Sequence, residues 1–344
     1  MRRRAILPWP PTIAIRVISR RYDSDGKLPL VQFHTYAIAM TTRFRGIDRR
    51  EGMLVQGAAG WAEFSPFLEY DSRESGPWLA AALDSAEREW PVPVRSQIAV
   101  NCTVPAVDAE LAHRIVSRSG CRTAKVKVAE RGQTRADDIA RVEAVRDALG
   151  PSGQVRIDAN GGWSVDDAVA AIAALSTAAH GLEYVEQPCA SVEELAAVRR
   201  RVDVPIAADE SIRRAEDPFR VVELEAADIA VLKVAPLGGV HACLRIAERI
   251  GLPVVVSSAV ETSIGLAAGL ALAAALPELP FACGLATTSL LDGDVVADPL
   301  VPVDGFLPVG RQVLDPVAYA AVAAEGQTDA RWQMRLSAVR AVLA

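Results

Sequence analysis

Six charged residues, three acids and three lysines, lie at the ends of short apolar runs in the middle of this chain. In chain order they are Lys125, Lys127, Asp158, Glu186, Asp209 and Lys233. The runs are rich in β-branched residues, which is typical of buried parallel strands. Because barrel enzymes place their reactive groups at the carboxyl ends of such strands, we expect the six side chains to form one site.

The three acids predict a metal site. Asp158, Glu186 and Asp209 belong to three successive predicted strands, one acid to each strand. Three carboxylates within about 4 Å of one another would repel by roughly 4 kcal/mol per pair at an effective dielectric constant near 20. A divalent cation would remove this conflict. Ligation by oxygen atoms alone favours Mg²⁺, with Mn²⁺ as the second option.

The lysines provide groups that can move a proton. Lys125 and Lys127 are two residues apart, so their side chains lie on the same face of a strand. The second and sixth strands of an eight-stranded barrel lie opposite each other, which places Lys233 across the site from Lys127. The charge of Lys125 lowers the pKa of its neighbour and favours a neutral amine that can act as a base. We therefore predict removal of a proton α to a carboxylate, with stabilisation of the resulting enediolate.

Each residue also has an ordinary structural explanation. A single aspartate at a strand end is usually a turn residue or a helix cap, and Lys-x-Lys usually marks an exposed edge strand. The combination of six such residues, in order on five successive strands, favours a site. Nucleophilic hydrolysis is disfavoured, because the chain has no G-x-S-x-G motif and none of its histidines ends a predicted barrel strand.

The surrounding sequence predicts the elements that hold these residues. From about residue 96, strand-like runs alternate with amphipathic helical segments, and the runs start roughly 23 to 30 residues apart. The predicted strands are Ile98–Cys102, Ala124–Val128, Gln154–Asp158, Leu182–Glu186, Pro205–Ala208, Asp228–Lys233, Pro253–Ser257 and Phe281–Gly284. Eight parallel strands with intervening helices close most naturally into a barrel. An open, doubly wound sheet is the alternative, but no G-x-G-x-x-G follows the first strand.

The two ends of the chain have different patterns. Residues 31–95 predict an α+β capping domain in front of a barrel at residues 96–293. The predicted elements of the cap are the strands Phe33–Met40, Met53–Ala58 and Gly60–Phe64 and the helix Pro77–Glu89. Residues 294–344, with a helix at Ala330–Leu343, are predicted to return to the cap, because a three-stranded unit needs added cover. Residues 1–30 are predicted to be a flexible extension.

Composition narrows the class of protein. The 344 residues, 51% of them hydrophobic, suit a barrel with an accessory domain. The net charge of −6 gives no reason to expect nucleic acid as a partner, and no run approaches the ~20 apolar residues that cross a membrane. The five cysteines are scattered without a C-x-x-C motif, which predicts free thiols and a cytoplasmic location. The oligomeric state is left open.

The motifs around the six residues resemble those of the enolase superfamily, in its muconate-lactonising subgroup. In chain order the motifs are K-x-K at 125–127, D-x-N at 158–160, E-Q-P at 186–188, D-E-S at 209–211 and the lysine at 233. Four further stretches are similar to the o-succinylbenzoate synthases of the actinobacterial type: Arg43–Gly46, Gly60–Phe67, Arg156–Trp163 and Ser257–Ser263. The similarity extends from about Phe33 to Val313, and the motifs are specific as a set.

The resemblance implies a fold and a reaction. The fold would be of the α/β class, a modified TIM barrel, (β/α)₇β, with an N-terminal α+β capping domain (enolase-like) and bound Mg²⁺. The reaction would be the dehydration of 2-succinyl-6-hydroxy-2,4-cyclohexadiene-1-carboxylate to o-succinylbenzoate in menaquinone biosynthesis. The implied partner is therefore a small-molecule carboxylate.

The resemblance also implies catalytic roles for the matching residues. Lys127, with Lys125 beside it, would remove the proton α to the ring carboxylate and then protonate the departing hydroxide. Lys233 would stabilise the enediolate. The implied metal ligands are Asp158, Glu186 and Asp209.

Supporting and substrate-binding roles follow from the same resemblance. The residues expected to support the metal ligands from behind are Asn160, Gln187 and Glu210. Arg156 faces inward one step below Asp158 and is a candidate for contact with the substrate or a capping loop. Ser257 and Ser258 are candidates for binding the succinyl carboxylate. Loops near Arg43–Gly46 and Ser65–Pro66 would close over the site.

Two other functions compete with the synthase. In an N-acylamino-acid racemase or dipeptide epimerase the same two lysines would act as a pair of bases, and neither fold nor motifs separate the reactions. The sequence of the N-terminal domain, which supplies specificity, favours the synthase. A non-catalytic barrel relative would have lost at least one metal ligand or lysine, whereas all six are present.

Overall fold

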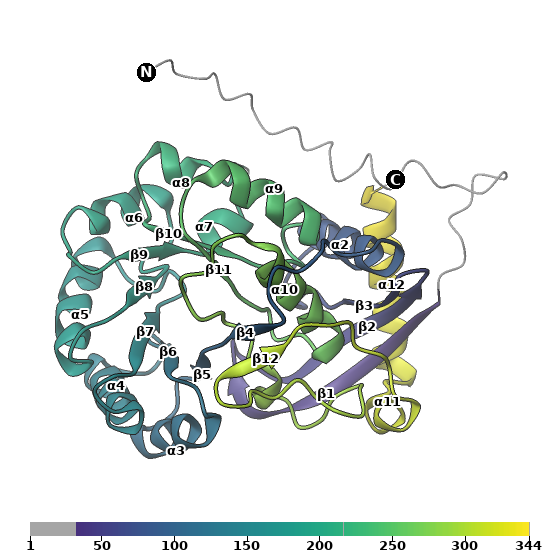
Figure 1. Cartoon of the computed structure of the whole chain (residues 1–344), viewed down its shortest axis with the longest axis horizontal. Coiled ribbons are helices and arrows are strands. Elements are labelled where there is room, and N and C mark those ends of the chain that lie inside the picture. Colours follow the sequence, from purple (N-terminus) through teal and green to yellow (C-terminus); the bar gives the residue numbers. More distant parts are fainter. Residues whose placement is uncertain (1–31, 216, 344) are drawn as a thin grey trace.

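The computed structural model of this protein describes residues 32–215 and 217–343. A small antiparallel sheet forms one side of the molecule, and parallel strands surrounded by helices form the other (Figure 1). The extension predicted over residues 1–30 lies outside the described residues.

The cap is built on a long hairpin whose turn points into the molecule. Its strands are β1 (Phe33–Phe44), β2 (Ile47–Gly57) and β3 (Gly60–Phe64), in the order β1-β2-β3. Arg45 and Gly46 form the turn with φ values of 50° and 77°, the left-handed conformation that a two-residue hairpin turn requires. Strand β1 extends beyond the predicted end at Met40, because the pairing continues to this turn.

One helix covers the sheet of the cap. Helix α2 (Gly76–Glu87) has Pro77 in its first turn, where the fixed φ of proline suits the helix. It packs on β2 and β3 and buries Trp78, Leu79 and several alanines. These side chains share one hydrophobic cluster with Met53, Val55 and Phe64 of the sheet. Burial of this apolar face explains why the segment folds onto the sheet.

The barrel strands form a seven-stranded parallel sheet in the order β11-β10-β9-β8-β7-β6-β5. They are β5 (Cys102–Val104), β6 (Thr123–Lys127), β7 (Gln154–Asp158), β8 (Tyr184–Glu186), β9 (Ile206–Ala208), β10 (Ile229–Leu232) and β11 (Val254–Val256). The helices along the barrel are α3 (Ala109–Ser119), α4 (Arg135–Leu149), α5 (Val165–Ala178), α6 (Val192–Arg199), α7 (Glu210–Arg213), α8 (Arg220–Glu223), α9 (Val240–Ile250), α10 (Ser263–Ala275) and a 3-10 turn (Thr288–Leu290). Side chains such as Val126, Ile157 and Val185 are buried against these helices, as their position between inward-facing residues predicts.

The two ends of the parallel sheet are joined by the segment that was predicted as the eighth strand. It contributes single parallel bridges, Val100 with Cys283 and Ser257 with Gly284, rather than a full strand. The prediction of one strand at Ile98–Cys102 is also wrong in detail. Residues Gln97–Ala99 form β4, which pairs antiparallel with β12 (Phe306–Pro308), and β5 begins at Cys102. The first run is divided because its two halves pair with different partners.

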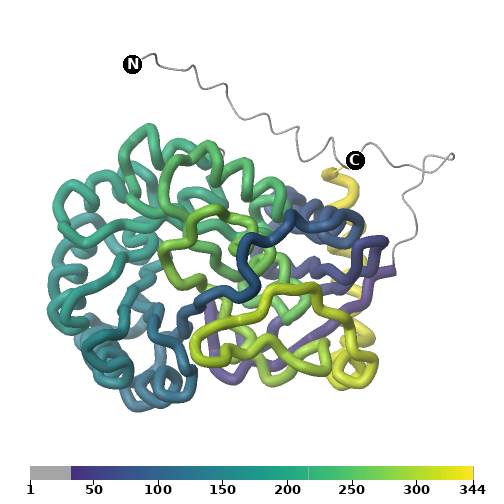
Figure 2. The backbone as a smooth tube through the Cα atoms, in the orientation of Figure 1, coloured from purple at the N-terminus to yellow at the C-terminus, as the bar shows by residue number. Residues whose placement is uncertain are grey.

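The C-terminal segment returns to the cap. After α11 (Pro316–Val322), helix α12 (Gly326–Leu343) runs along the cap sheet beside α2, as Figures 1 and 2 both show. Trp332, Leu336 and Val339 of α12 join the hydrophobic cluster of the cap. The cap core is therefore completed by residues from the far end of the chain.

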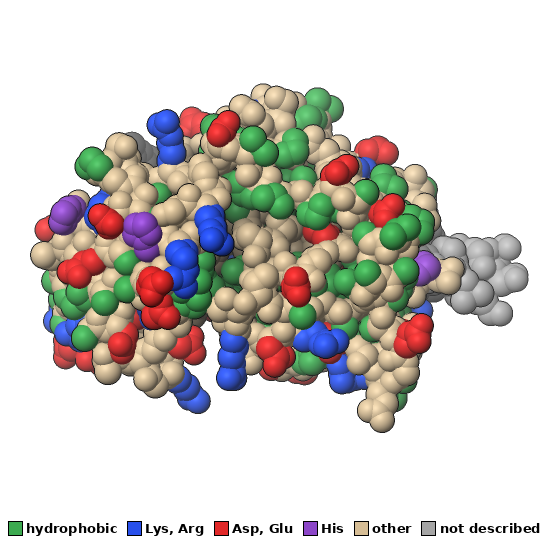
Figure 3. Space-filling model, turned by 90° about the horizontal axis from the view of Figure 1, so that it is seen from below, with side chains coloured by type: hydrophobic (Ala, Val, Ile, Leu, Met, Phe, Trp, Pro, Cys, Tyr) green, Lys and Arg blue, Asp and Glu red, His purple; other side chains and the backbone are tan. Residues whose placement is uncertain are grey.

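The surface of the molecule carries charge of both signs. Figure 3 shows acidic and basic side chains interspersed over one face of the molecule, without separation by sign. In the described part of the chain, no helix has the length and apolar character needed to cross a membrane.

Candidate active site at the carboxyl end of the barrel strands

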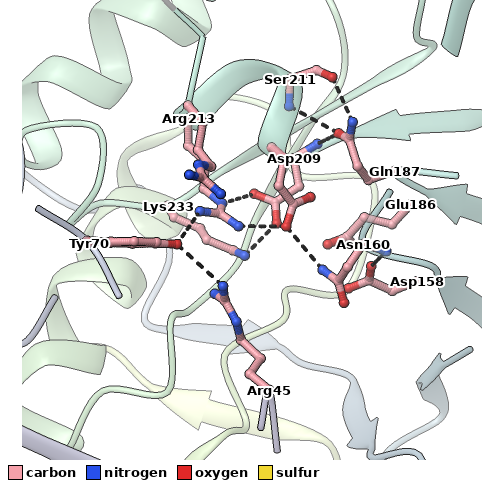
Figure 4. Close-up of polar contacts among 12 residues, drawn as sticks. Arg45, Tyr70, Asp158, Asn160, Glu186, Gln187, Asp209, Ser211, Arg213 and Lys233 are labelled. Carbon is pink, nitrogen blue, oxygen red and sulfur yellow. Dashed lines mark hydrogen bonds and ion pairs between the residues drawn. The ribbon is translucent and has the colours of Figure 1, made fainter. Parts of the chain in front are cut away.

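Strand register brings the charged residues of β6, β7 and β8 to the same height. Lys127 is the register partner of Asp158, and Asp158 is the register partner of Glu186. Asp209 and Lys233 directly follow β9 and β10. The six residues predicted from the sequence therefore end five adjacent strands, and Figure 4 shows several of them converging.

A cavity separates this end of the barrel from the cap. It has a volume of about 410 Å³, counting its open mouth. Its lining includes Lys125, Lys127, Lys233, Asn160, Ser257 and Ser258 from the barrel and Phe44, Arg45 and Phe67 from the cap. The three lysines thus share one cavity, and the hairpin turn of the cap closes one side of it.

Ion pairs connect the lysines to the acids. Lys125 Nζ lies 2.7 Å and 2.8 Å from the two carboxylate oxygens of Glu186, and 3.2 Å from Asp158 Oδ2. Lys127 Nζ donates to the same Asp158 oxygen at 2.5 Å. Lys233 Nζ donates to Asp209 Oδ2 at 2.6 Å. All three carboxylates are almost fully buried, so these contacts are shielded from water.

The environment shifts the pKa values of the carboxyl groups in different directions. Burial together with the negative charge of Asp158 raises the pKa of Glu186 to about 7, despite the opposing effect of Lys125. Burial would also raise the pKa of Asp158, but Lys127 and Lys125 outweigh it and lower that pKa. Burial is likewise outweighed at Asp209, whose pKa is lowered by Arg213 and Lys233.

The two lysines of β6 are shifted in opposite directions. Burial lowers the pKa of Lys127, and the positive charge of Lys125 lowers it further, against the opposing effect of Asp158. At Lys125 burial also acts to lower the pKa, but Glu186 and Asp158 outweigh it and raise that pKa. Lys127 is therefore the lysine of this strand whose neutral form is favoured by its surroundings.

The three residues predicted to support the acids contact them or their neighbours. Lys127 Nζ also donates to Asn160 Oδ1 at 2.6 Å, and Asn160 Nδ2 donates to Glu210 Oε1 at 3.1 Å. Gln187 Oε1 accepts hydrogen bonds from the backbone N–H groups of Asp209, at 3.0 Å, and Ser211, at 3.1 Å. Gln187 thus fixes the backbone that carries Asp209 (Figure 4).

The chemistry of the acids fits a hard divalent cation. In the described ranges, 32–215 and 217–343, no group of three or more His, Cys, Asp or Glu side chains is arranged to hold a metal ion. The three carboxylates are paired with lysines instead. Asp158 and Asp209 both raise the pKa of Glu186, so the three negative charges act on one another. Glu210 Oε2 is buried without a hydrogen-bond partner. Carboxylate oxygens are the ligands that Mg²⁺ prefers, so a cation could bind among these oxygens in place of the ion pairs with the lysines.

The three residues predicted to bind substrate differ in whether they line the cavity. Ser257 and Ser258 line the cavity, and Ser258 Oγ lies 2.7 Å from Thr287 Oγ1. The prediction for Arg156 is wrong. Its side chain is fully buried and faces inward, but the guanidinium turns away from the cavity and donates to Glu183 at 2.5 Å and to the Ala282 carbonyl at 2.7 Å. The strand alternation predicted its face correctly, but not the direction along the barrel in which its long side chain extends.

Sequence reasoning missed a cation beside Asp209. Arg213 Nε donates to Asp209 Oδ1 at 2.9 Å, and its Nη2 donates to Glu210 Oε1 at 2.6 Å. The four-residue spacing from Asp209 is a helical spacing that could have indicated this pair. Arg213 Nη1 also donates to the hydroxyl of Tyr70, a cap residue, at 2.9 Å, and nothing in the local sequence indicates that contact.

Two family models match this chain. One is described as enolase C-terminal domain-like and matches residues 107–313, and the other is described as enolase N-terminal domain-like and matches residues 35–86. A protein of Thermobifida fusca named o-succinylbenzoate synthase is 66% identical, over 89% of this chain and 95% of that protein. The chain belongs to the o-succinylbenzoate synthase family of the enolase superfamily. A relative of the same name from Mycolicibacterium smegmatis is 57% identical, over 91% of this chain and 97% of that protein.

Solved structures agree with this assignment of the fold. The muconate lactonizing enzyme of Pseudomonas fluorescens, in complex with muconolactone, has a TM-score of 0.74 and 22% identity, covering 86% of this chain and 98% of that chain. A dipeptide epimerase from Enterococcus faecalis, complexed with Mg and the dipeptide L-Leu-L-Tyr, has a TM-score of 0.70 and 25% identity, covering 82% and 97%. The prediction of an enolase-like modified TIM barrel with a capping domain is confirmed.

Proposed function

We propose that this protein dehydrates 2-succinyl-6-hydroxy-2,4-cyclohexadiene-1-carboxylate to o-succinylbenzoate, a hydro-lyase reaction of menaquinone biosynthesis. One observation carries the proposal: the chain matches 95% of the length of the Thermobifida fusca synthase at 66% identity. The geometry supports it, because the lysines needed for the chemistry line a single cavity next to three buried carboxylates.

Lys127 is the base in this proposal. Contacts with Asp158 and Asn160 hold its Nζ at the cavity. The neutral amine takes the proton from the ring carbon that bears the carboxylate, and an enediolate forms. The resulting ammonium then protonates the hydroxyl that leaves the neighbouring carbon, so water departs and the ring becomes aromatic. One side chain thus handles both proton transfers.

Lys233 provides the complementary charge. Its ammonium lines the same cavity from the strand end of β10 and is held by Asp209. A buried ammonium at this position stabilises negative charge on the enediolate more strongly than it would in water. Lys125 forms ion pairs with Glu186 and Asp158, and its ammonium keeps a positive charge beside Lys127 during both proton transfers.

The proposed ligands of the metal are Asp158, Glu186 and Asp209, supported by Asn160, Gln187 and Glu210. Bound Mg²⁺, or Mn²⁺ as the second option, would supply positive charge to the carboxylate of the substrate. Ser257 and Ser258 are proposed to bind the succinyl carboxylate at the other end of the cavity. The free, buried cysteines suit a reducing compartment, and we propose that the protein acts in the cytoplasm.

The racemase or epimerase alternative is less well supported. Relatives that are 55–66% identical over most of this chain are named as synthases, whereas the dipeptide epimerase structure is 25% identical. The lysine pair by itself would suit either reaction, so the distinction rests on these identities.

An ultraviolet assay tests the proposal. Purified protein is mixed with the cyclohexadiene substrate and Mg²⁺, with and without excess chelator, and the aromatic product is followed. Metal-dependent formation of the product is the expected result. Folded, metal-loaded protein that gives no product would contradict the proposal, and exchange of the α-proton of N-acylamino acids in D₂O would then test the alternative.

A further inference from the structure

The loop that follows β11 has a strained backbone. Val260 has a φ of +62°, in the left-handed region that β-branched residues rarely occupy. Its side chain is buried, and both Val260 and the preceding Ala259 line the active-site cavity together with Ser257 and Ser258. The shape of the cavity wall at residues 257–261 therefore depends on a conformation that the local sequence does not favour.

A buried arginine of the cap holds this loop. Arg50, on β2, is 2% exposed, and its Nε donates to the Val260 carbonyl at 2.9 Å. Its Nη2 donates to the Ala259 carbonyl at 3.2 Å. The planar guanidinium thus contacts two successive carbonyl oxygens, one on each side of the Cα atom of the strained residue Val260. A lysine ammonium could not reproduce this geometry.

The same guanidinium holds the cap loop that faces the cavity. Arg50 Nη2 donates to the Ser65 carbonyl at 2.5 Å and to Ser65 Oγ at 3.0 Å. The carbon of the guanidinium lies 4.5 Å from the centre of the Phe67 ring, and Phe67 lines the cavity. Arg50 itself is not part of the cavity lining. It therefore contacts both walls of the site without contacting the space where a substrate would lie.

Cap residues also contact the loop or the residue after it: Glu63 of β3 accepts from the Thr262 N–H at 3.0 Å, and Val260 packs in one hydrophobic cluster with Tyr36 and Ile38. Arg50, however, is the cap side chain that bonds to the carbonyl oxygens of Ala259 and Val260 themselves. Glu261 Oε2 accepts from the Ala259 N–H at 2.7 Å, and Ser258 Oγ accepts from the Val260 N–H at 3.4 Å. These bonds are local to the loop and move with it. The bonds from Arg50 come from a strand of the cap about 210 residues earlier in the chain, so they fix the loop relative to the cap.

We propose that Arg50 is a positioning residue that locks the cavity wall at residues 257–261 against the cap, by holding Val260 in its left-handed conformation. The inference rests on the proposed function in that this wall would bind the carboxylate tail of the substrate through Ser257 and Ser258. Arg50 then sets the affinity for substrate and takes no part in the proton transfers.

The first test is the variant Arg50→Met, with Arg49→Met as the matched control. Arg49 is the adjacent residue of β2 and is exposed to solvent. Steady-state kinetics of the synthase reaction at saturating Mg²⁺ should show KM for the substrate raised at least about tenfold in Arg50→Met, because bonds from a charged donor are lost. We expect kcat to change much less, and the control to match the wild type. An unchanged KM in folded Arg50→Met would overturn the proposal.

The second test reports on the loop without substrate. Hydrogen–deuterium exchange of peptides covering residues 257–262 should be faster in Arg50→Met than in the wild type, while peptides from α4 and α5 are unchanged. This readout stays valid if the chain proves to catalyse another reaction. It therefore separates failure of the inference from failure of the proposed function. Unchanged exchange in the loop would contradict the inference.

A double-mutant cycle tests the link to Val260. Glycine accepts a positive φ without strain, so removal of Arg50 should cost less in a Val260→Gly background. We expect the increase in KM caused by Arg50→Met to be several-fold smaller there, whereas equal increases in both backgrounds would contradict the link. Should Arg50→Met not fold, Arg50→Lys retains the charge but lacks the fork. Its KM and loop exchange should then rise, and wild-type values would refute the proposal.

Discussion

Arg213 and Tyr70 connect the barrel to the cap at the edge of the active site. The guanidinium of Arg213 donates to the Tyr70 hydroxyl at 2.9 Å and, through another nitrogen, to Asp209 at 2.9 Å. Tyr70 also accepts from Arg45, in the turn of the cap hairpin, at 3.4 Å (Figure 4). The position of the cap is therefore coupled to the side chain that anchors Lys233.

Removing the Tyr70 hydroxyl should weaken this coupling. We expect Tyr70→Phe to lower kcat/KM about fivefold, the effect of losing roughly one hydrogen bond, with little change in stability. Tyr319→Phe is the matched control, because the Tyr319 hydroxyl donates to the Thr35 carbonyl at 3.0 Å and does not line the cavity. Equal kinetic effects of the two variants would show that the contact with Arg213 has no special role.

Lys127→Ala should abolish turnover while metal binding is retained. The expected loss in kcat is at least about 10²-fold, because a positioned base contributes on that scale. Asp158 keeps its contact with Lys125, so calorimetric titration with Mg²⁺ should still detect binding. Lys127→Arg separates the two conceivable roles: it keeps the charge but cannot act as a base, and should be as inactive as the alanine variant. Full activity of either variant would refute the assignment.

Metal addition should stabilise the folded protein. A ligand present at a hundredfold excess over its Kd stabilises the native state by about 2.7 kcal/mol, so Mg²⁺ should raise the thermal midpoint and chelator should reverse the change. Glu186→Gln should require more Mg²⁺ for the same shift. The control Asp166→Asn, at a highly exposed position paired with Arg201, should match the wild type. A Mg²⁺ response that is identical in Glu186→Gln would remove Glu186 from the ligand set.

The buried carboxyl group of Glu63 should make stability depend on pH. Glu63 accepts from Tyr36 OH at 2.7 Å and from the Thr262 N–H at 3.0 Å, and burial raises its pKa despite the opposing effect of Arg50. A carboxyl group with a raised pKa binds its proton more tightly in the folded state than in the unfolded state. Its contribution therefore favours folding at low pH and is lost as pH rises from about 4.3, the unfolded value, through the folded pKa.

Glu63→Gln should remove this contribution. The amide keeps the shape of the side chain but does not titrate, so urea unfolding between pH 4 and pH 8 should show a smaller decline of the unfolding free energy with rising pH than in the wild type. Glu89→Gln, at an exposed site, is the control. Identical pH profiles for wild type and Glu63→Gln would show that Glu63 has the same pKa in both states.

The C-terminal helix should be necessary for a stable cap. Trp332 is fully buried, meets the ring of Phe64 edge-on at 6.0 Å and donates from Nε1 to Glu51 at 2.9 Å. Trp332→Ala should destabilise the protein by about 3–5 kcal/mol, the usual cost of emptying such a site, as measured by denaturant unfolding. Met334→Ala, at a largely exposed position of the same helix, should have little effect. A small loss in Trp332→Ala would mean that α12 contributes little to the cap.

The sequence by itself determined the parts of this protein that follow from local periodicity. Alternation along a strand placed Lys125 and Lys127 on one face, and the order of strand ends brought Asp158, Glu186 and Asp209 toward one site. The barrel followed from the regular spacing of its strands. These inferences succeed because side-chain direction in a strand depends on chain position alone, and because parallel strands with short connections have few ways to close.

Only the tertiary structure decided how distant segments meet. Arg50 contacts Val260 across about 210 residues, and Arg213 contacts Tyr70 across 143, and no local pattern encodes either pair. The same reason explains the error at Arg156, whose long side chain reached Glu183 instead of the cavity. A flexible side chain takes the direction in which its charge finds a buried partner, and the partner is set by packing of the whole chain.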